Sequence, residues 1–374
     1  MGTDLLSRRD VSILKGAGIL MIFLHNYLHW ERDMGIENEF AFSASGFKAF
    51  LDHAFDGPLA FFRYSFAYFG HFGVQLFVLT SGYGLAVSAR SKREECYLGY
   101  LVPKLIKILA LLLLGALVIS VVRFIKNGRS FDVGVVAEIV MGRMTSIWNF
   151  SGSDIFRYSG PFWFFGLIVQ LYVLFPFLNR AFERFSSKGA FALVAGIIVL
   201  NAVLYPIAQR YDVPLMGIFM GHLPVFLFGM LLARQGLRIH PGLVVAALGV
   251  FLLGQFHVAF FTATFLAAAI CMISGFLVLR QLGNTRAGQW VGELLVRVGD
   301  ISMAIFILNG PLRGLDLFRD AQGDLLSSRL PLFTLILFLL AVPVAFLFKR
   351  LAAGMQFVYD RLIGMLSGTK GPFR

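Results

Sequence analysis

Apolar runs long enough to cross a lipid bilayer recur along almost the whole chain. A helix needs about 20 mostly apolar residues to span the hydrocarbon core. The 374 residues are 58% hydrophobic and only 14% charged, whereas soluble domains carry about a quarter charged residues. These values predict an all-α polytopic membrane protein.

About ten transmembrane helices are expected from these runs. They lie at 11–28, 68–89, 105–122, 161–178, 189–206, 214–233, 242–257, 259–279, 296–311 and 331–348. An even number puts both termini on one side, and the segments on that side hold 21 of the 33 Lys and Arg residues. The positive-inside rule then predicts cytoplasmic termini. We expect one transmembrane domain over 1–374, ending in a short amphipathic cytoplasmic tail at 349–374.

The net charge of +12 is spread between the hydrophobic runs instead of forming one patch. We interpret it as a topology signal, so nucleic-acid binding is not expected. The two cysteines, Cys96 and Cys271, have no metal-ligand spacing, and the sequence predicts neither a metal site nor a structural disulfide. No small-residue cleavage site follows the first apolar run, so we expect it to be retained as a span.

Ionisable side chains interrupt the first predicted span at Lys15, His25 and His29. In one interpretation Lys15 extends back to the headgroups and the histidines anchor the far interface. In the other, an ionisable group held inside a membrane is functional, and a histidine is a natural proton acceptor. The second interpretation makes His25 the stronger candidate for a functional group.

Lys104 and Lys107 share one face at the start of the third predicted span, because residues three apart are neighbours on a helix. Two cations there are consistent with a simple topology signal. Alternatively, they form with Lys15 a phosphate site for a nucleotide-like donor that enters from the cytosol.

Other polar groups also fall within predicted spans. In the second span they are Gln75 and the run 80–83, which contains Ser81 and Tyr83; in the fourth they are Trp163, Gln170 and Tyr172; in and after the ninth they are Asp300, Ser302, Asn309 and Arg313. Aromatic belts and helix packing explain some of these positions as well as a substrate channel does.

Several segments, taken together, resemble the acyltransferase-3 family of integral membrane O-acyltransferases, which modify bacterial surface polysaccharides and related glycans. The matching segments are 14–26, 70–85, 100–108, 159–176, 223–234 and 299–311. They occur in the family's order and cover most of the chain. The resemblance implies ten spans, a cytosolic acyl-CoA donor and an acceptor on the outer side.

The resemblance also implies roles for individual residues. Lys15 and His25 take the places of the catalytic basic residue and histidine, although nine residues separate them where the family usually has ten, and Asn26 fills the tenth place. The donor-binding residues are expected to be Lys104, Lys107, Ser81 and Tyr83. The acceptor or channel residues are expected to be His29, Trp163, Gln170, Asn309 and Arg313. Lysines stand where the family has paired arginines, and Asn309 stands where many members have histidine.

The expected activity is transfer of an acyl group, in the first instance acetyl, from acetyl-CoA to a hydroxyl of an exported or cell-surface polysaccharide or its lipid-linked precursor. His25 acts as general base or as transient acyl carrier. No tightly bound cofactor is expected, and the partners are acyl-CoA, the glycan and membrane lipid of the bacterial inner membrane. The loops at 31–66 and 123–158, the latter with Trp148, Arg143 and Arg157, are expected to select the acceptor.

A proton-coupled secondary transporter is the alternative, because it also has about ten spans and buried polar groups. The sequence shows no pair of matching broken spans in its two halves, which counts against this alternative. A non-catalytic sensor or scaffold would leave the pattern of Lys15 and His25 unexplained.

Overall fold

The computed structural model describes residues 5–31, 37–90, 96–128, 132–235 and 239–366. Apart from an isolated bridge between Arg319 and Leu325, the regular structure in these ranges is helical. The α-helices are α1 (Arg8–Leu28), α2 (Ala44–His53), α3 (Pro58–Phe69), α4 (Gly73–Ala89), α5 (Tyr97–Asn127), α6 (Val133–Met144), α7 (Trp163–Arg184), α8 (Ser187–Arg210), α9 (Phe219–Gln235), α10 (Pro241–Phe256), α11 (Val258–Phe261), α12 (Thr264–Leu279), α13 (Arg286–Asp300), α14 (Ser302–Arg313) and α15 (Leu330–Leu366).

Six helical segments within the described ranges are long and apolar enough to cross a membrane. They are Arg8–Leu28, Pro58–Ala89, Tyr97–Asn127, Gly160–Arg184, Ser187–Arg210 and Ser327–Met365. Three shorter apolar helices, Phe219–Arg234, Pro241–Phe256 and Thr264–Leu279, coincide with three more of the predicted spans. The prediction of an all-α multi-pass protein is confirmed, whereas the count of ten and the cytoplasmic termini stay predictions.

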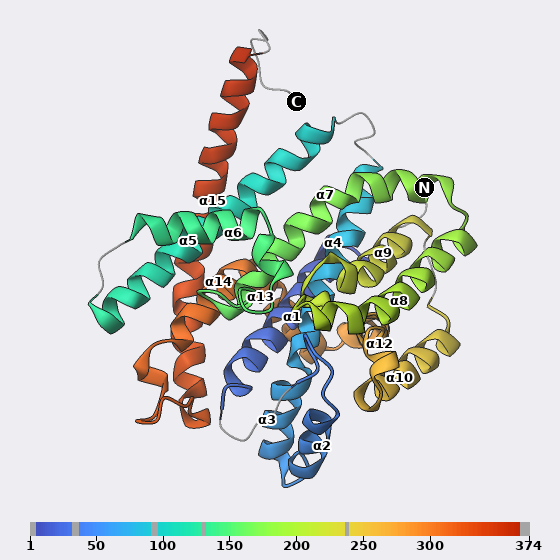
Figure 1. The fold of residues 1–374 in the computed structure, drawn as a ribbon, viewed down its shortest axis with the longest axis horizontal. Coiled ribbons are helices and arrows are strands. Elements are labelled where there is room, and N and C mark those ends of the chain that lie inside the picture. Colours follow the sequence, from blue (N-terminus) through green and yellow to red (C-terminus); the bar gives the residue numbers. More distant parts are fainter. Residues whose placement is uncertain (1–4, 32–36, 91–95, 129–131, 236–238, 367–374) are drawn as a thin grey trace.

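Two predicted boundaries differ from the structure. The expected ninth span at 296–311 is broken, because α13 ends at Asp300 and α14 begins at Ser302, with Ile301 in a non-helical conformation between them. α13 carries charged side chains along one face and does not continue the apolar character of α14. The expected tail also does not begin as a separate element, because α15 runs without interruption from Leu330 to Leu366 and extends beyond the rest of the molecule (Figure 1).

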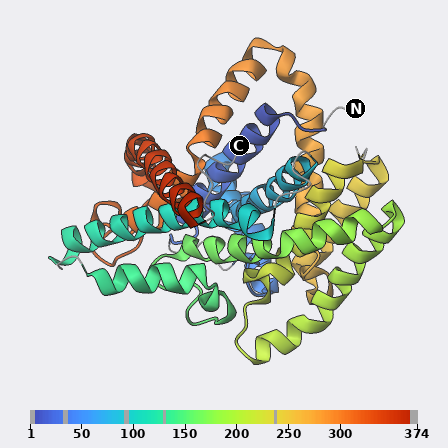
Figure 2. The ribbon, with the colours of Figure 1, turned by 90° about the horizontal axis from the view of Figure 1, so that it is seen from above.

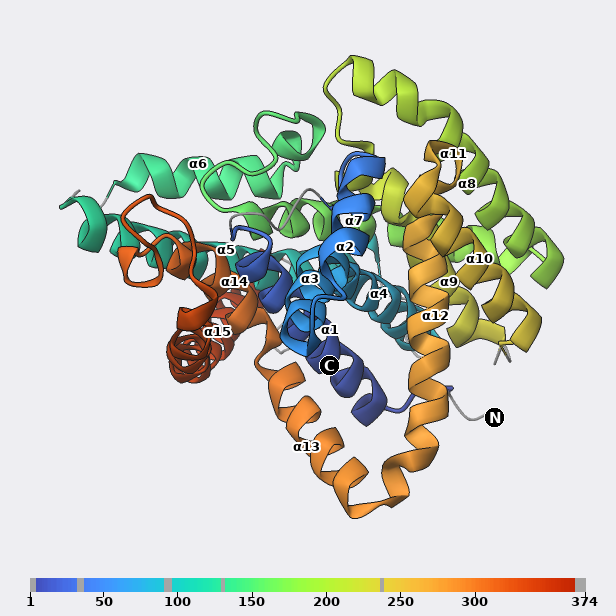
Figure 3. The ribbon, with the colours of Figure 1, turned by 90° about the horizontal axis from the view of Figure 1, so that it is seen from below.

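Helices α1 and α4 lie at the centre of the molecule and the other helices surround them (Figures 2 and 3). α1 packs against α3, α4, α13 and α14, while α4 makes its most extensive contact with α9. A Cβ atom added at Gly82 would lie 2.2 Å from the carbonyl oxygen of Phe226, and one added at Gly229 would lie 2.2 Å from that of Leu79. The backbones of α4 and α9 therefore touch through two glycines, as is common between membrane helices.

Candidate active site

A cavity of about 770 Å³ opens beside the first half of α1. We call it the lysine cavity, because its lining includes Lys15, Lys104 and Lys107. Ser81 from α4 also lines it, as does Asp300 at the end of α13. Four of the residues predicted to take part in catalysis or donor binding are therefore brought together, although they come from three helices far apart in sequence.

Tyr83 was predicted to bind the donor, but it is not among the residues that line the lysine cavity. Its hydroxyl donates a hydrogen bond to the carbonyl oxygen of Leu6 (3.1 Å) and accepts one from the Leu6 amide (2.9 Å). Ser81 and Tyr83 are two residues apart on a helix, so their side chains point in different directions, and a role for Tyr83 in donor binding stays a prediction. Tyr83 instead fixes the chain just before α1 begins.

The start of α1 is held by a capping box, in which the Ser7 side chain accepts a hydrogen bond from the Asp10 amide and the Asp10 carboxylate accepts one from the Ser7 amide. The same carboxylate lies 3.2 Å from the Arg280 guanidinium. These contacts satisfy amide groups that the first helical turn leaves without partners. They fix the position of the helix that carries Lys15.

Lys104 lies at the meeting of two cavities. Its ammonium group donates to the carbonyl oxygen of Tyr100 (3.0 Å) and lies 3.7 Å from the centre of the Tyr100 ring. An adjoining cavity of about 520 Å³ shares Tyr100 and Lys104 with the lysine cavity and adds Arg180 from α7. The two cavities together present cations, hydroxyls and an aromatic ring, which suit a ligand with phosphate groups and a planar base.

A second cavity, of about 830 Å³, lies beside the other end of α1. We call it the histidine cavity, because His25, His29 and His71 line it. Trp163 and Arg313 line it as well, so four of the residues predicted to act on the acceptor or as base meet there. The cavity also includes residues that the sequence did not single out, among them Glu37, Glu39 and Tyr158, which come from the two loops predicted to select the acceptor.

His25 is 2% exposed and its ring orientation is fixed. Its Nδ1 lies 2.9 Å from the carbonyl oxygen of Ala67, and because a carbonyl oxygen only accepts, Nδ1 carries the hydrogen. Nε2 is then the acceptor nitrogen, and it has no hydrogen-bond partner among the described residues. Glycine at position 70 lets the backbone there pack closely against His25, since a Cβ atom on Gly70 would lie 2.6 Å from that of His25. The arrangement leaves a lone pair of a buried imidazole available to a substrate.

Two carboxylates accompany the histidines. Glu39 Oε2 lies 3.9 Å from His25 Nε2, and Glu37 Oε2 lies 3.2 Å from His29 Nδ1. Burial raises the pKa of Glu39 well above its usual range, and the charge of Glu37 raises it further. Burial also opposes ionisation of Glu37, but the hydrogen bond and charge of His29 outweigh it and lower that pKa to about 2. The pKa values of the two carboxyl groups are therefore shifted in opposite directions, that of Glu37 downward and that of Glu39 upward.

The sequence predicts no metal site, but this cluster contains three side chains of types that can bind a metal ion. One ligand atom each from His25, His29 and Glu37 lies within 4.8 Å of the others. Tetrahedral zinc, with bonds of about 2.0–2.1 Å, brings its ligand atoms to within roughly 3.4 Å of one another. The three groups would have to close in to hold such an ion, and in this arrangement Glu37 is hydrogen-bonded to His29 instead.

Gln170 and Asn309 were predicted to line the acceptor channel, but neither is among the residues that line the two larger cavities. The Gln170 side chain accepts a hydrogen bond from the Phe219 amide (2.8 Å) and so fixes the start of α9. Asn309 is fully buried, and its side-chain nitrogen and oxygen have no hydrogen-bond partner among the described residues. Its helical neighbour Gly310 lines the histidine cavity in its place.

Phenylalanine rings separate the two cavities. Phe164 and Phe165 line the lysine cavity, and Phe306 lines the histidine cavity. The Phe306 ring centre lies 5.3 Å from that of Phe164 and 5.6 Å from that of Phe165. Such edge and tilted contacts are favourable between aromatic rings. The linings of the two cavities therefore meet at these three rings.

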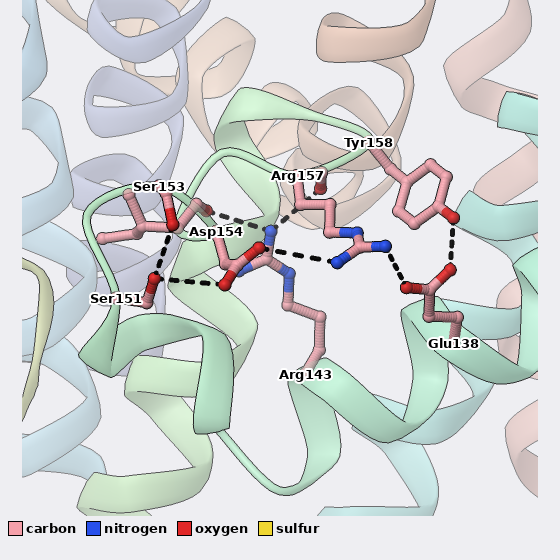
Figure 4. A network of polar contacts seen from close by, with 8 residues as sticks. Glu138, Arg143, Ser151, Ser153, Asp154, Arg157 and Tyr158 are labelled. Carbon is pink, nitrogen blue, oxygen red and sulfur yellow. Dashed lines mark hydrogen bonds and ion pairs between the residues drawn. The ribbon is translucent and has the colours of Figure 1, made fainter.

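The wall of the histidine cavity that contains Tyr158 is held by a polar network centred on Arg143 (Figure 4). Arg143 is fully buried and donates to the carbonyl oxygens of Ile155 (3.0 Å) and Arg157 (3.1 Å). Glu138 accepts from both Arg157 and Tyr158. Arg143 therefore shapes the loop. It is not among the residues that line the histidine cavity, and neither are Arg157 and Trp148.

Replacing Arg143 by Met is expected to destabilise the protein. The Ile155 and Arg157 carbonyls would lose their donor inside the protein, and each unpaired buried carbonyl costs about 1–3 kcal/mol. Thermal unfolding of the purified protein in detergent should show a lower Tm for Arg143→Met. The exposed Arg210→Met variant is the control and should unfold at the wild-type temperature.

Comparison with known proteins identifies the family of the chain. The family model described as an acyltransferase domain matches residues 9–350, nearly the whole chain. Neither the search of curated proteins nor the search of solved structures found a match. The matched range includes the residues that line the lysine and histidine cavities, among them Lys15, Lys104 and Lys107. The chain therefore belongs to the acyltransferase-3 family and is a multi-pass membrane acyltransferase.

Proposed function

We propose that the protein transfers an acyl group, in the first instance acetyl, from cytosolic acyl-CoA to a hydroxyl of an exported or cell-surface glycan or its lipid-linked precursor, in the bacterial inner membrane. One observation carries the proposal. α1 presents Lys15 to one cavity and His25 to another, and the rings of Phe164 and Phe306, which line one cavity each, lie 5.3 Å apart. His25 follows Lys15 by ten positions along the helix, which is about 15 Å along the axis.

The lysine cavity supports the donor half of the proposal. Lys15, Lys104 and Lys107 can hold the phosphates of coenzyme A, and the adjoining cavity offers the Tyr100 ring to its adenine. The pantetheine arm then extends along α1 towards His25 and passes the rings of Phe164 and Phe306. This path places the thioester carbonyl at the boundary of the histidine cavity.

The chemistry at the histidine cavity is ester formation. The acceptor hydroxyl oxygen attacks the thioester carbonyl carbon, and its proton passes to Nε2 of His25 as the C–O bond forms. The tetrahedral intermediate then loses the C–S bond, and the imidazolium returns the proton to the departing thiolate. The hydrogen bond from Nδ1 to Ala67 supports this role, because it leaves Nε2 as the base. In the alternative route Nε2 attacks the carbonyl itself and carries the acyl group to the hydroxyl.

Purified protein incubated with radiolabelled acetyl-CoA tests the proposal. Release of CoA that requires an added glycan establishes transfer, and label retained on the protein before glycan is added identifies the covalent route. The acyl groups succinyl and butyryl should be tried in the same way. Absence of CoA binding and of CoA release with every acyl group would contradict the proposal.

The double variant Lys104→Gln and Lys107→Gln is expected to raise the KM for acetyl-CoA by at least about tenfold, because each ammonium–phosphate hydrogen bond is lost. The kcat should change little, since neither lysine lies in the cavity that contains His25. Initial rates measured over a range of acetyl-CoA concentrations give both constants. Lys188→Gln, at an exposed position, is the matched control. A fall in kcat at unchanged KM would show that the lysines do not bind the donor.

A further inference from the structure

The histidine cavity contains a buried guanidinium that has no carboxylate partner among the described residues. Arg313, the last residue of α14, is 6% exposed and lines this cavity. Its Nη1 donates to the carbonyl oxygen of Asn26, and its Nε has no hydrogen-bond partner in the described part of the chain. The guanidinium carbon lies 5.9 Å from the centre of the Trp30 ring. Charged groups this deeply buried are usually paired, so the hydrogen-bonding capacity that the Arg313 guanidinium leaves unused requires an explanation.

A second cation stands beside it. Arg319 also lines the cavity, and its Nε donates to the carbonyl oxygen of Arg313 (3.2 Å), while its Nη1 donates to that of Gly323. Both guanidinium groups are thus held by backbone carbonyls. Two cations placed together without an anion repel each other, and a bound anion would relieve the repulsion.

Three carboxylates in this region, those of Glu31, Glu37 and Glu39, lie against other residues. Glu31 pairs with Arg63 (2.9 Å) and accepts hydrogen bonds from Ser327, and Glu37 pairs with His29. Glu39 Oε2 lies 3.9 Å from His25 Nε2. Among the described residues that line the cavity, neither Arg313 nor Arg319 therefore forms an ion pair with a carboxylate.

The same cavity carries aromatic surface. Trp163 is 5% exposed and its ring meets that of Phe40 edge to face, while Phe156 packs on the other side of Phe40. Tyr158 adds a phenol to the rim. Such rings offer apolar faces on which the C–H face of a sugar ring can pack, and they leave polar recognition to the charged groups nearby.

We propose that the acceptor of this enzyme is an anionic glycan, whose carboxylate or phosphate binds Arg313 and Arg319 while a neighbouring hydroxyl lies at His25 Nε2. The inference rests on the proposed function, because it names the substrate class of the same site. Arg313 has the planar fork that binds a carboxylate or a phosphate through two parallel hydrogen bonds. The anion would come either from the glycan itself, as a uronic acid does, or from the phosphate of a lipid-linked precursor.

Acceptor preference tests the proposal without any variant. The protein is placed in nanodiscs of phosphatidylcholine, so that no net anionic lipid competes for the arginines. Three probes are compared at equal concentration: a glucuronic-acid-containing oligosaccharide, the same oligosaccharide after reduction of its carboxyl groups, and a neutral oligosaccharide linked to polyprenyl diphosphate. Wild-type enzyme is expected to use the first or the third at least tenfold faster than the second. A preference for the second would overturn the proposal.

Variants then locate the effect. Arg313→Gln should raise the KM for the preferred anionic probe by about ten- to a hundredfold, as expected for the loss of a charge-assisted hydrogen-bonded pair, and leave the neutral probe unaffected. The KM of Arg313→Lys for the anionic probe should fall between those of wild type and Arg313→Gln, because lysine keeps the charge but lacks the planar guanidinium. Arg319→Gln, at a less buried position, gives an independent variant if Arg313→Gln does not fold, and Arg210→Gln is the control. An equal loss on anionic and neutral probes would contradict the proposal.

Binding of the anionic probe without donor separates this inference from the proposed function. Tryptophan fluorescence reports it, since Trp30 lies close to Arg313. Binding that Arg313→Gln abolishes, in a protein that transfers no acyl group, would support the anion site and refute the transferase proposal. Transfer to a neutral glycan in a protein that does not bind the anionic probes would do the reverse.

Discussion

The His25→Ala variant is expected to lose between about 10² and 10⁴ of the wild-type rate of acyl transfer, the usual contribution of a positioned general base. The structure supports a large effect for three reasons. The imidazole is buried, its Nδ1 is committed to Ala67, and its Nε2 is open towards the histidine cavity. Loss of the ring also leaves the Ala67 carbonyl without its donor. Transfer of radiolabel from acetyl-CoA to glycan, measured at saturating donor, gives the rate.

A matched pair of controls makes this result specific. His53→Ala removes a half-exposed imidazole from α2 and should keep wild-type activity. His25→Gln retains a polar side chain of similar size and should be as inactive as His25→Ala, because an amide does not accept a proton at neutral pH. Acetyl-CoA should bind both His25 variants with unchanged affinity, since the lysine cavity is intact. Activity of His25→Ala within threefold of wild type would exclude His25 as base and as acyl carrier.

The Gly229→Val variant is expected to destabilise the protein by about 3 kcal/mol or more, at the upper end of the cost of overpacking a core. Its Cβ would lie 2.2 Å from the carbonyl oxygen of Leu79, which is backbone and cannot rotate away. Helices α4 and α9 would have to separate by more than 1 Å to reach ordinary contact, and α4 carries Ser81 of the lysine cavity. Both Tm and affinity for acetyl-CoA should fall.

Gly84→Ala is the control for this prediction, since Gly84 lies on α4 and nothing lies within 4 Å of an added Cβ. It should leave Tm unchanged or raise it slightly, because alanine favours helix over glycine. The double variant with Gly82→Ala provides a further check. Gly82 and Gly229 belong to one contact, so the two losses of stability should not add. A Gly229→Val protein with the wild-type Tm would show that α4 and α9 do not pack as described.

Residue type and order predicted the helical membrane architecture and part of the site. Long apolar runs force helices in a bilayer, because each backbone amide must find its partner within its own segment. Ionisable groups inside such runs are costly, so Lys15 and His25 stood out from their surroundings. Lys104 and Lys107 were found in the same way. In the structure Lys15, Lys104 and Lys107 line the lysine cavity, and His25 lines the histidine cavity.

The predicted site residues that do not line the lysine or histidine cavity differ from the others in side-chain direction. Tyr83, Gln170 and Asn309 are polar residues in apolar helices, as the sequence shows, but whether such a side chain faces a cavity or a backbone group depends on the neighbouring helix. The break at Ile301 was missed for a similar reason. Apolar residues on both sides of it were interpreted as one span, whereas α13 ends at Asp300 and α14 begins at Ser302.

The sequence by itself determined that the chain crosses a membrane in apolar helices, and that a histidine and a lysine lie about 15 Å apart on the first of them. Only the tertiary structure decided what stands opposite these two groups. Glu37 and Glu39 reach His25 and His29 from a loop, and Arg313 arrives from a helix nearly 290 residues along the chain. Charge and hydrogen bonding act over a few ångströms of space, so groups that are remote in sequence acquire their chemistry only when the fold brings them together.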